Sequence, residues 1–163
     1  MLADTHVKDD GARKVPARVW AMVRAADVVI HAGDVLSAAF LDRLEATTPT
    51  YTVLGNNDVG LTGRLPETLE LTLGGVAIGV IHDSGPRVGR ARRMRRRFPA
   101  AQLVVFGHSH IPVDEEGVDG QRLLNPGSAT TRRRQPHHTV ARLTLAGGRI
   151  AHHELVVVDE PSG

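Results

Sequence analysis

The sequence predicts an α/β fold in which a parallel first half is followed by a mostly β second half. In the first 54 residues, short apolar runs and helical patterns alternate in the order strand, helix, strand, helix, strand. This order is typical of right-handed crossovers in a parallel sheet. Two later pairs of strand-like stretches flank Gly-Gly turns, as β-hairpins do. The 163 residues contain no repeat or linker, so we expect a single domain over residues 1–163.

The first half supplies the elements of the parallel sheet. Pro16 suits the first turn of a helix that ends near residue 26, and Val19 and Val23 lie on its apolar face. Residues 27–31 and 51–54 are predicted strands, with a helix over residues 36–46 between them. Only three residues precede Asp4, so we expect either a very short first strand or a natural chain that begins upstream of Met1.

The second half is predicted to form two hairpins with a helix and shorter strands between them. The hairpins cover residues 69–81, around Gly74-Gly75, and residues 139–158, around Gly147-Gly148. A basic helix over residues 87–98 stops at Pro99, and a strand follows at 103–106. The apolar side of this helix is expected to consist of Val88, Ala91, Met94 and Phe98.

The composition excludes several classes of protein. Cysteine is absent, so a disulfide framework and a cysteine-based zinc site are both impossible. No apolar stretch is long enough to cross a membrane, and the first residues lack the pattern of a signal peptide. We therefore expect a soluble, cytoplasmic protein with no membrane partner.

Five short segments rich in His, Asp and Asn carry the candidate chemistry. They are Asp4-Thr5-His6, His31-Ala32-Gly33-Asp34, Gly55-Asn56-Asn57-Asp58, Ile81-His82-Asp83 and Gly107-His108-Ser109-His110. Four of them follow predicted strands, and ligands bind at the carboxyl ends of strands in open α/β sheets. In extended backbone, the i, i+2 spacing of each Asp/His or His/His pair aims both side chains to one side. Nitrogen and oxygen donors of this kind suit Mn, Fe, Zn, Ni or Co.

Together these segments resemble the calcineurin-like metallophosphoesterase family. The resemblance is carried by Asp4-x-His6, Gly33-Asp34, Gly55-Asn56, His82 and Gly107-His108-x-His110. The short length and Asn125-Pro126-Gly127-Ser128 resemble the family's small bacterial and archaeal phosphodiesterase branch. The resemblance implies a four-layer αββα sandwich of two mixed β-sheets flanked by helices, with a shortened first strand in this chain.

The resemblance also implies a site that holds two divalent metal ions. Asp4, His6 and His110 would hold one metal, Asn56, His82 and His108 the other, and Asp34 would bridge them. Manganese is the expected metal, with Ni, Fe, Zn, Co or Mg as alternatives. A hydroxide bridging two such cations attacks phosphorus in line, while the metals neutralise the phosphoryl oxygens. The chain is thus expected to be a dinuclear metal-dependent phosphoesterase, and specifically a phosphodiesterase. The residues expected to carry the reaction are Asp34, Asn56, His82 and His108.

Near the predicted ligands, two positions depart from the family pattern. Many members have a proton-donating His after the metal-binding Asn, where this chain has Asn57. Because an amide is a very poor acid, we expect substrates with good leaving groups to be favoured. Ser84 stands where the family often has another His; Ser84 and Asn56 are the predicted substrate contacts. Asp58 either orients a metal-binding group or is simply a turn residue.

Other functions stay open at this point. A retromer subunit resembles the same fold and acts mainly through protein contacts, so a scaffold is one alternative. A nuclease that uses the basic helix at residues 87–97 is another, although a solvated helix face is favoured. A monoesterase would use the same site. The expected partner is a phosphate ester, nucleic acid is possible but not favoured, and the chain is a possible homo-oligomer.

The remaining histidines are not predicted ligands. Neighbouring residues of a strand point to opposite faces, so His137-His138 and His152-His153 are left out of the site. His31 is either a hydrogen-bond donor near a metal ligand or a packed residue at a strand end.

Overall fold

The computed structural model describes residues 1–10 and 14–159. Its elements follow the predicted order and differ from the predicted bounds by a few residues. They are α1 (Ala17–Ala25), β1 (Val29–His31), α2 (Ala38–Thr47), β2 (Thr50–Thr52), η1 (Val59–Leu61), β3 (Thr68–Leu73), β4 (Val76–Ile81), α3 (Arg90–Arg97), β5 (Leu103–Val105), β6 (Val113–Glu116), η2 (Val118–Gly120), β7 (Arg122–Asn125), β8 (Thr139–Ala146) and β9 (Arg149–Val157).

We call the two strand pairs β1/β2 and β8/β9 the first sheet, because hydrogen bonds of the N-terminal segment join them. β1 pairs in parallel with β2, and β8 pairs antiparallel with β9. Between these pairs lies the N-terminal segment, where Leu2 forms an isolated parallel bridge with His31. Leu2 N donates to Ile30 O (2.8 Å), and Ala141 N donates to Met1 O (3.1 Å). The expected short first strand is therefore a single bridge that is hydrogen-bonded on both sides.

The second sheet has the order β3-β4-β5-β7-β6. The pairs β4/β5 and β5/β7 are parallel, whereas β3/β4 and β6/β7 are antiparallel, so the sheet is mixed. The predicted hairpin around Gly74-Gly75 is formed by β3 and β4. The C-terminal hairpin is formed by β8 and β9, which belong to the first sheet.

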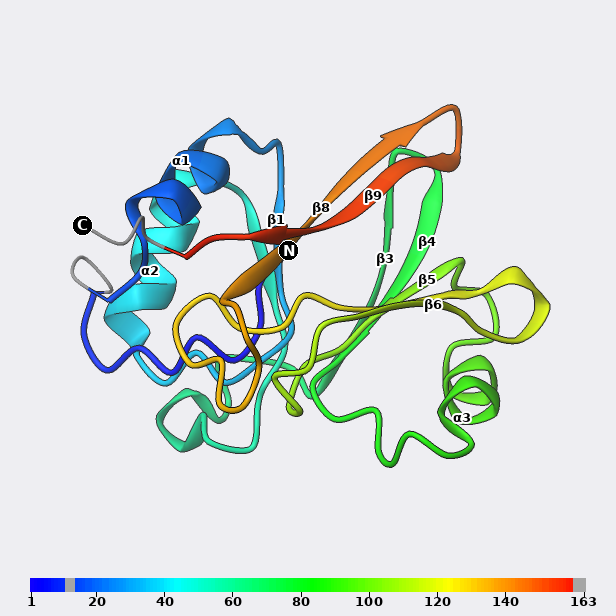
Figure 1. Cartoon of the computed structure of the whole chain (residues 1–163), viewed down its shortest axis with the longest axis horizontal. Helices are drawn as coiled ribbons and strands as arrows, with labels where there is room; N and C mark the ends of the chain where they lie inside the picture. Colours follow the sequence, from blue (N-terminus) through cyan, green and yellow to red (C-terminus); the bar gives the residue numbers. More distant parts are fainter. Residues whose placement is uncertain (11–13, 160–163) are drawn as a thin grey trace.

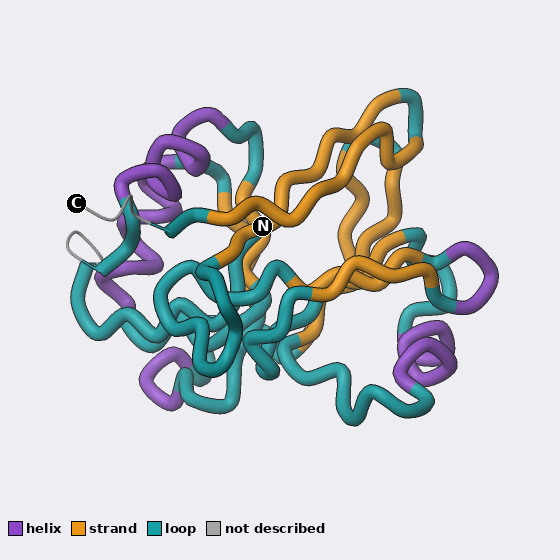
Figure 2. Tube along the Cα trace, in the orientation of Figure 1, coloured by secondary structure: helices purple, strands orange, loops and turns teal. Residues whose placement is uncertain are grey.

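Three hydrophobic clusters lie between the four layers of the fold, which are helices, sheet, sheet and helix. Val29 of β1 belongs to the cluster with α1 and α2, whereas its neighbour Ile30 belongs to the cluster between the sheets. In β5, Leu103 and Val105 face the first sheet, and Val104 packs with Met94 of α3. This alternation is the period of two expected of strands buried on both faces. The predicted αββα sandwich is thus confirmed, and its layers run from α1 and α2 to α3 across Figures 1 and 2.

The basic helix α3 begins later than predicted. Gly89 caps it with a left-handed backbone (φ 75°), so the chain before the helix turns away. Val88, which was expected on the apolar face, is 89% exposed, and this expectation is wrong. Met94 and Phe98 are buried as expected.

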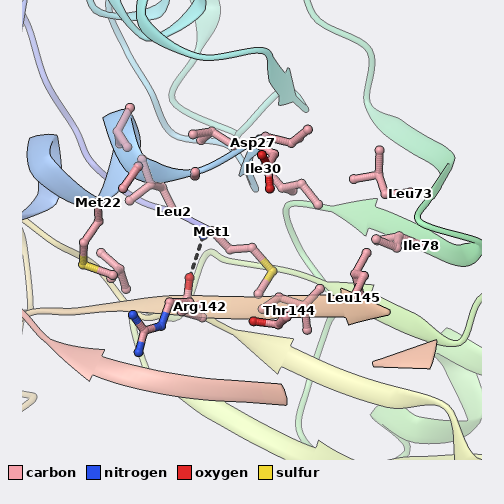
Figure 3. Close-up of a pocket in the computed structure, with 18 of the residues that line it drawn as sticks. Met1, Leu2, Met22, Asp27, Ile30, Leu73, Ile78, Arg142, Thr144 and Leu145 are labelled. Atoms are coloured by element: carbon pink, nitrogen blue, oxygen red, sulfur yellow. Dashed lines mark hydrogen bonds between the residues drawn. The ribbon is translucent and has the colours of Figure 1, made fainter. Parts of the chain in front are cut away.

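A cavity of about 560 Å³ lies at the upstream end of β1, between α1 and the two sheets. Apolar side chains of Met1, Met22, Leu73, Ile78 and Leu145 are among those that line it (Figure 3). The candidate ligands follow the opposite, carboxyl ends of the strands, and none of them lines this cavity. No helix within the described ranges is long and apolar enough to cross a membrane.

His31 is a packed residue at the end of β1. It is fully buried, its Nε2 lies 3.0 Å from Thr5 Oγ1, and its ring meets Phe40 edge to face. No described residue makes a hydrogen bond to its Nδ1. Burial lowers the pKa of His31 to about 3. Of the two interpretations of His31, the packed residue is the one the structure supports.

Replacing Gly79 by Ala should destabilise the fold by about 1–3 kcal/mol, because overpacking a tight core forces neighbours to move. A Cβ on Gly79 would lie 2.6 Å from Cγ of the buried Phe98 ring. Gly60→Ala is the matched control, since no heavy atom lies within 4 Å of its added Cβ. Urea unfolding of both variants measures the difference. Equal stability in the two would contradict this account of Phe98 packing.

Burial of neutral His31 should make the metal-free protein less stable as the pH falls. An unfolded His takes up a proton near pH 6.5, whereas folded His31 does not until about pH 3. Stability from this residue is therefore complete above pH 6.5 and is lost below it. The variant His31→Phe should lose about 2 kcal/mol less between pH 7 and pH 5. Urea unfolding in a chelator at both pH values tests this, and an unchanged loss would exclude His31 as the cause.

Candidate metal centre

The seven predicted ligands lie on loops that follow strands of both sheets. Asp4 and His6 follow the Leu2 bridge, Asp34 follows β1, and Asn56 follows β2. From the second sheet, His82 follows β4, and His108 and His110 follow β5. Since these parallel strands end at a common edge, the structure brings all seven side chains together.

The backbone that carries these residues is not extended, so that part of the sequence argument is wrong. Asp4, His6, Asp34, His108 and His110 have positive φ angles of 52°, 46°, 59°, 68° and 59°. Left-handed backbone is unfavourable for residues with a Cβ and persists only where the surroundings impose it. The side chains converge because each loop turns back on its strand, and not because alternate residues share one face.

The first group consists of Asp4, His6 and His110. One ligand atom from each lies within 4.8 Å of the others. The Nε2 atoms of the two histidines are 3.2 Å apart, and His110 Nε2 is 3.5 Å from Asp4 Oδ1. His110 Nδ1 donates to the carbonyl oxygen of Thr131, which leaves Nε2 as an acceptor in the neutral ring. Burial lowers the pKa of His110 to about 4, which favours the neutral ring.

The second group consists of Asn56, His82 and His108. Asn56 Oδ1 lies 3.0 Å from His82 Nε2 and 2.9 Å from His108 Nδ1. His82 Nδ1 donates to the carbonyl oxygen of Ala32 (2.7 Å), so its Nε2 is an acceptor in the tautomer that this bond selects. Two acceptors about 3.0 Å apart match neighbouring ligands around an octahedral ion with bonds of about 2.1 Å.

Asp34 lies between the two groups. Its Oδ2 is 3.5 Å from His6 Nε2 and also 3.5 Å from His82 Nε2. Asn57 donates to both carboxylate oxygens, from its backbone N to Oδ1 (2.9 Å) and from Nδ2 to Oδ2 (2.7 Å). Burial alone would raise the pKa of Asp34, but these hydrogen bonds together with the nearby His82 and His6 outweigh it, and the pKa is lowered. Asp34 is therefore a carboxylate that faces both groups.

The carboxylate of Asp4 is only half satisfied, since Oδ1 accepts from His108 N (3.1 Å). Its Oδ2 is buried, and no described residue makes a hydrogen bond to it. Burial, with the nearby charge of Asp34, raises the pKa of Asp4 to about 8. A buried carboxylate is stabilised by a cation, and here the free oxygen lies within a cluster of acceptors. The donor set of this chain therefore fits divalent metal ions.

Asp58 holds two of the ligand loops together. Its buried carboxylate accepts from Asp34 N (2.9 Å), Gly55 N (2.8 Å) and Leu36 N (2.7 Å). It thus orients the backbone around Asp34 and Asn56, while no contact with a ligand side chain is found among the described residues. Ser84 is also buried, and its carbonyl oxygen accepts from Arg93 Nε (3.0 Å).

Sequence reasoning missed two supports of the site. Asn57 was considered only as a missing proton donor, yet it clamps Asp34. Ser128 Oγ donates to the carbonyl oxygen of Asp4 (2.7 Å), and Thr131 accepts from His110. The run Asn125-Pro126-Gly127-Ser128 was the available signal for the second support, because it follows the last predicted ligand segment, Gly107-His108-Ser109-His110.

Several arginines of the basic helix α3 form hydrogen bonds, ion pairs or ring contacts with other residues of the chain. Arg93 donates to the carbonyl oxygens of Ser84, Pro86 and Val88, which secures the loop after His82. Arg95 Nε lies 3.2 Å from Asp119 Oδ2. Other arginines of this helix stack on aromatic rings, with Arg90 over Phe106 and Arg97 over Phe98. The sequence favoured a solvated helix face, but these contacts show that part of α3 also holds neighbouring segments in place.

Two solved structures share this fold. An archaeal phosphodiesterase aligns with a TM-score of 0.75 over 96% of each chain, at 19% sequence identity. Vps29 from Entamoeba histolytica, in complex with Zn²⁺, aligns with a TM-score of 0.71 over 97% of each chain, at 23% identity. At these identities the likeness extends to the architecture of the two sheets and their helices.

Sequence comparisons identify the family. A probable metallophosphoesterase from Methanothermobacter thermautotrophicus is 30% identical over 135 residues, which cover 82% of this chain and 77% of that protein. The model of the calcineurin-like phosphoesterase superfamily domain matches residues 1–148, which include all seven predicted ligands. The chain therefore belongs to the calcineurin-like phosphoesterase superfamily.

Proposed function

We propose that this protein hydrolyses phosphate esters, and preferentially phosphodiesters, with two divalent metal ions. The observation that carries the proposal is the cluster of facing acceptors around the unpartnered oxygen of Asp4. Asp4, His6 and His110 would hold one ion, Asn56, His82 and His108 the other, and Asp34 both. Manganese is the ion we expect, and Ni, Fe, Zn, Co and Mg are alternatives that the same nitrogen and oxygen donors can hold.

The chain's own residues would orient the reaction. When bound, two divalent ions lower the pKa of water and neutralise charge on the phosphoryl group. The bonds of His82 to Ala32 and of His110 to Thr131 hold the ligand nitrogens toward the ions. Asn56 offers a neutral oxygen, so the site keeps a net attraction for an anionic ester. Asn56 and Ser84 remain the proposed substrate contacts.

The preference for diesters rests on a likeness between folds, whereas Asn57 affects which leaving groups are favoured. Asn57 cannot protonate a leaving group, so esters whose alcohol departs without a proton, such as aryl diesters, should react fastest. We therefore expect esters of acidic alcohols to react faster than esters of simple alkyl alcohols. The preference for diesters is supported by the archaeal phosphodiesterase, which has the same fold.

Two alternatives make different predictions. A scaffold that works through protein contacts is represented by the Vps29 neighbours, which share the fold. A scaffold would not need seven potential metal ligands close together, so their convergence favours the enzyme over the scaffold. A nuclease would need the basic helix for nucleic acid, but Arg93 and Arg95 already bind groups of the chain itself.

Metal-stripped protein should hydrolyse bis-p-nitrophenyl phosphate only after Mn, Ni, Zn or Mg is added back, with Mn as the most effective. Asp34→Ala and His108→Ala should each reduce the rate at least about a hundredfold, because each removes a ligand. His152→Ala is the control, since His152 is exposed and lies on β9. If folded protein shows no turnover with any of these metals, the enzyme proposal fails and the scaffold is favoured.

Asp58→Asn should weaken Mn binding about 10- to 100-fold, because groups that orient metal ligands contribute that much to affinity. An amide has one acceptor oxygen where the carboxylate serves three backbone N–H groups. Calorimetric titration with Mn measures the affinity, and Asp27→Asn, at an exposed position, is the control. Unchanged affinity in Asp58→Asn would mean that the two loops keep their geometry without this carboxylate.

A further inference from the structure

The loop between β7 and β8 packs directly on segments that carry proposed ligands. Ser128 Oγ donates to the carbonyl oxygen of Asp4 (2.7 Å), and the Thr130 hydroxyl donates to that of Thr5. On the other side, the Thr131 carbonyl accepts from His110. Figure 1 shows this yellow to orange loop beside the blue N-terminal segment. The loop is therefore anchored to the group formed by Asp4, His6 and His110.

Three arginines follow this anchor in a tight turn. Gln135 N donates to the carbonyl oxygen of Arg132 (2.9 Å), and Arg132 Nη1 donates to that of Gln135 (2.6 Å). Arg132 is thus used to close the turn. Arg133 has a left-handed backbone (φ 51°), and its exposed side chain makes no hydrogen bond or ion pair with the described residues.

The charge of Arg133 acts on the ligand group. Burial is the largest cause of the pKa shifts of Asp4, His6 and His110, and the positive charge of Arg133 lowers the pKa of each of them as well. Arg133 follows Thr131, whose carbonyl accepts from His110, by two residues, so Arg133 is placed beside the ligand group, and it has no acidic partner among the described residues. A positive charge beside bound divalent cations is unfavourable unless an anion lies between them. The phosphoryl group of an ester is an anion of the right kind.

We propose that Arg133 is a substrate-binding residue whose guanidinium binds a non-bridging phosphoryl oxygen on the side of Asp4, His6 and His110. Arginine suits this role because its donors form a planar fork that matches phosphate oxygens and keeps its charge at any physiological pH. The proposal rests on the proposed function. Because the contact is to the phosphoryl group, product phosphate and all ester substrates would use it alike.

The test compares Arg133→Gln with Arg134→Gln, its exposed neighbour in the same turn. Calorimetry with inorganic phosphate on Mn-loaded protein gives the dissociation constant, and bis-p-nitrophenyl phosphate hydrolysis gives KM. Arg133→Gln should weaken phosphate binding about 10- to 100-fold and raise KM similarly, as loss of a charge-assisted hydrogen bond does. Arg134→Gln should stay within about twofold of the wild type, since an isolated surface charge contributes little. Arg133→Lys should be intermediate, and Mn affinity should not fall in any of the three variants, because none of them removes a metal ligand.

The outcomes separate this proposal from the proposed function. Equal weakening in both glutamine variants would mean a general attraction of anions and would overturn the role of Arg133. Absence of phosphate binding to the metal-loaded wild type would overturn it as well. If phosphate binding depends on Arg133 but no ester is hydrolysed, the enzyme proposal fails and the anion site stands. If hydrolysis is normal and KM is unchanged in Arg133→Gln, the enzyme proposal stands and Arg133 has no part in it.

Discussion

The candidate metal site depends on one electrostatic constraint: several buried hydrogen-bond acceptors face one another there. Asp34 Oδ2 lies 3.5 Å from nitrogens of both His6 and His82, and the second oxygen of Asp4 has no donor among the described residues. Removing such groups from water is unfavourable unless a donor or a cation compensates them. For Asp34, hydrogen bonds from Asn57 supply part of that compensation. For Asp4, the backbone N–H of His108 compensates Oδ1 (3.1 Å), but no described residue donates to Oδ2, so the greatest need for a cation is at that oxygen.

The fold creates this crowding by stacking two sheets. Cores on both sides of the sheets bury β1, β4 and β5, and the ends of β1 and β2 lie near those of β4 and β5. Glycines then let the loops approach closely. A Cβ on Gly55 would lie 2.2 Å from the backbone N of Asp34, and one on Gly33 would lie 2.7 Å from His82 Nδ1. Side chains at these positions would push the ligand loops apart.

Positive charge is divided between structural and exposed positions. In α3, Arg93 secures the loop after His82, and Arg95 pairs with Asp119. In the loop after β7, Arg132 closes a turn, whereas Arg133 stays exposed beside the ligand group. A cluster of arginines in a sequence therefore says little about function until the acceptor of each guanidinium is known. Here the longer basic run is mostly structural, and the shorter one carries the exposed charge near the site.

The sequence by itself determined the order of the elements and the kinds of side chain at the site, because apolar periodicity and strand-end polar residues are local signals. It also identified the family through the ligands from Asp4 to His110. Only the tertiary structure decided how these residues meet, since left-handed loops, and not the pleat of a strand, aim Asp4, His6 and His110. The hydrogen bonds of Asn57 to Asp34 and of Asp58 to three backbone N–H groups connect residues that are mostly distant in the chain. The position of Arg133 depends on how the loop after β7 turns. Local sequence patterns do not predict such contacts, so they became visible only in the tertiary structure.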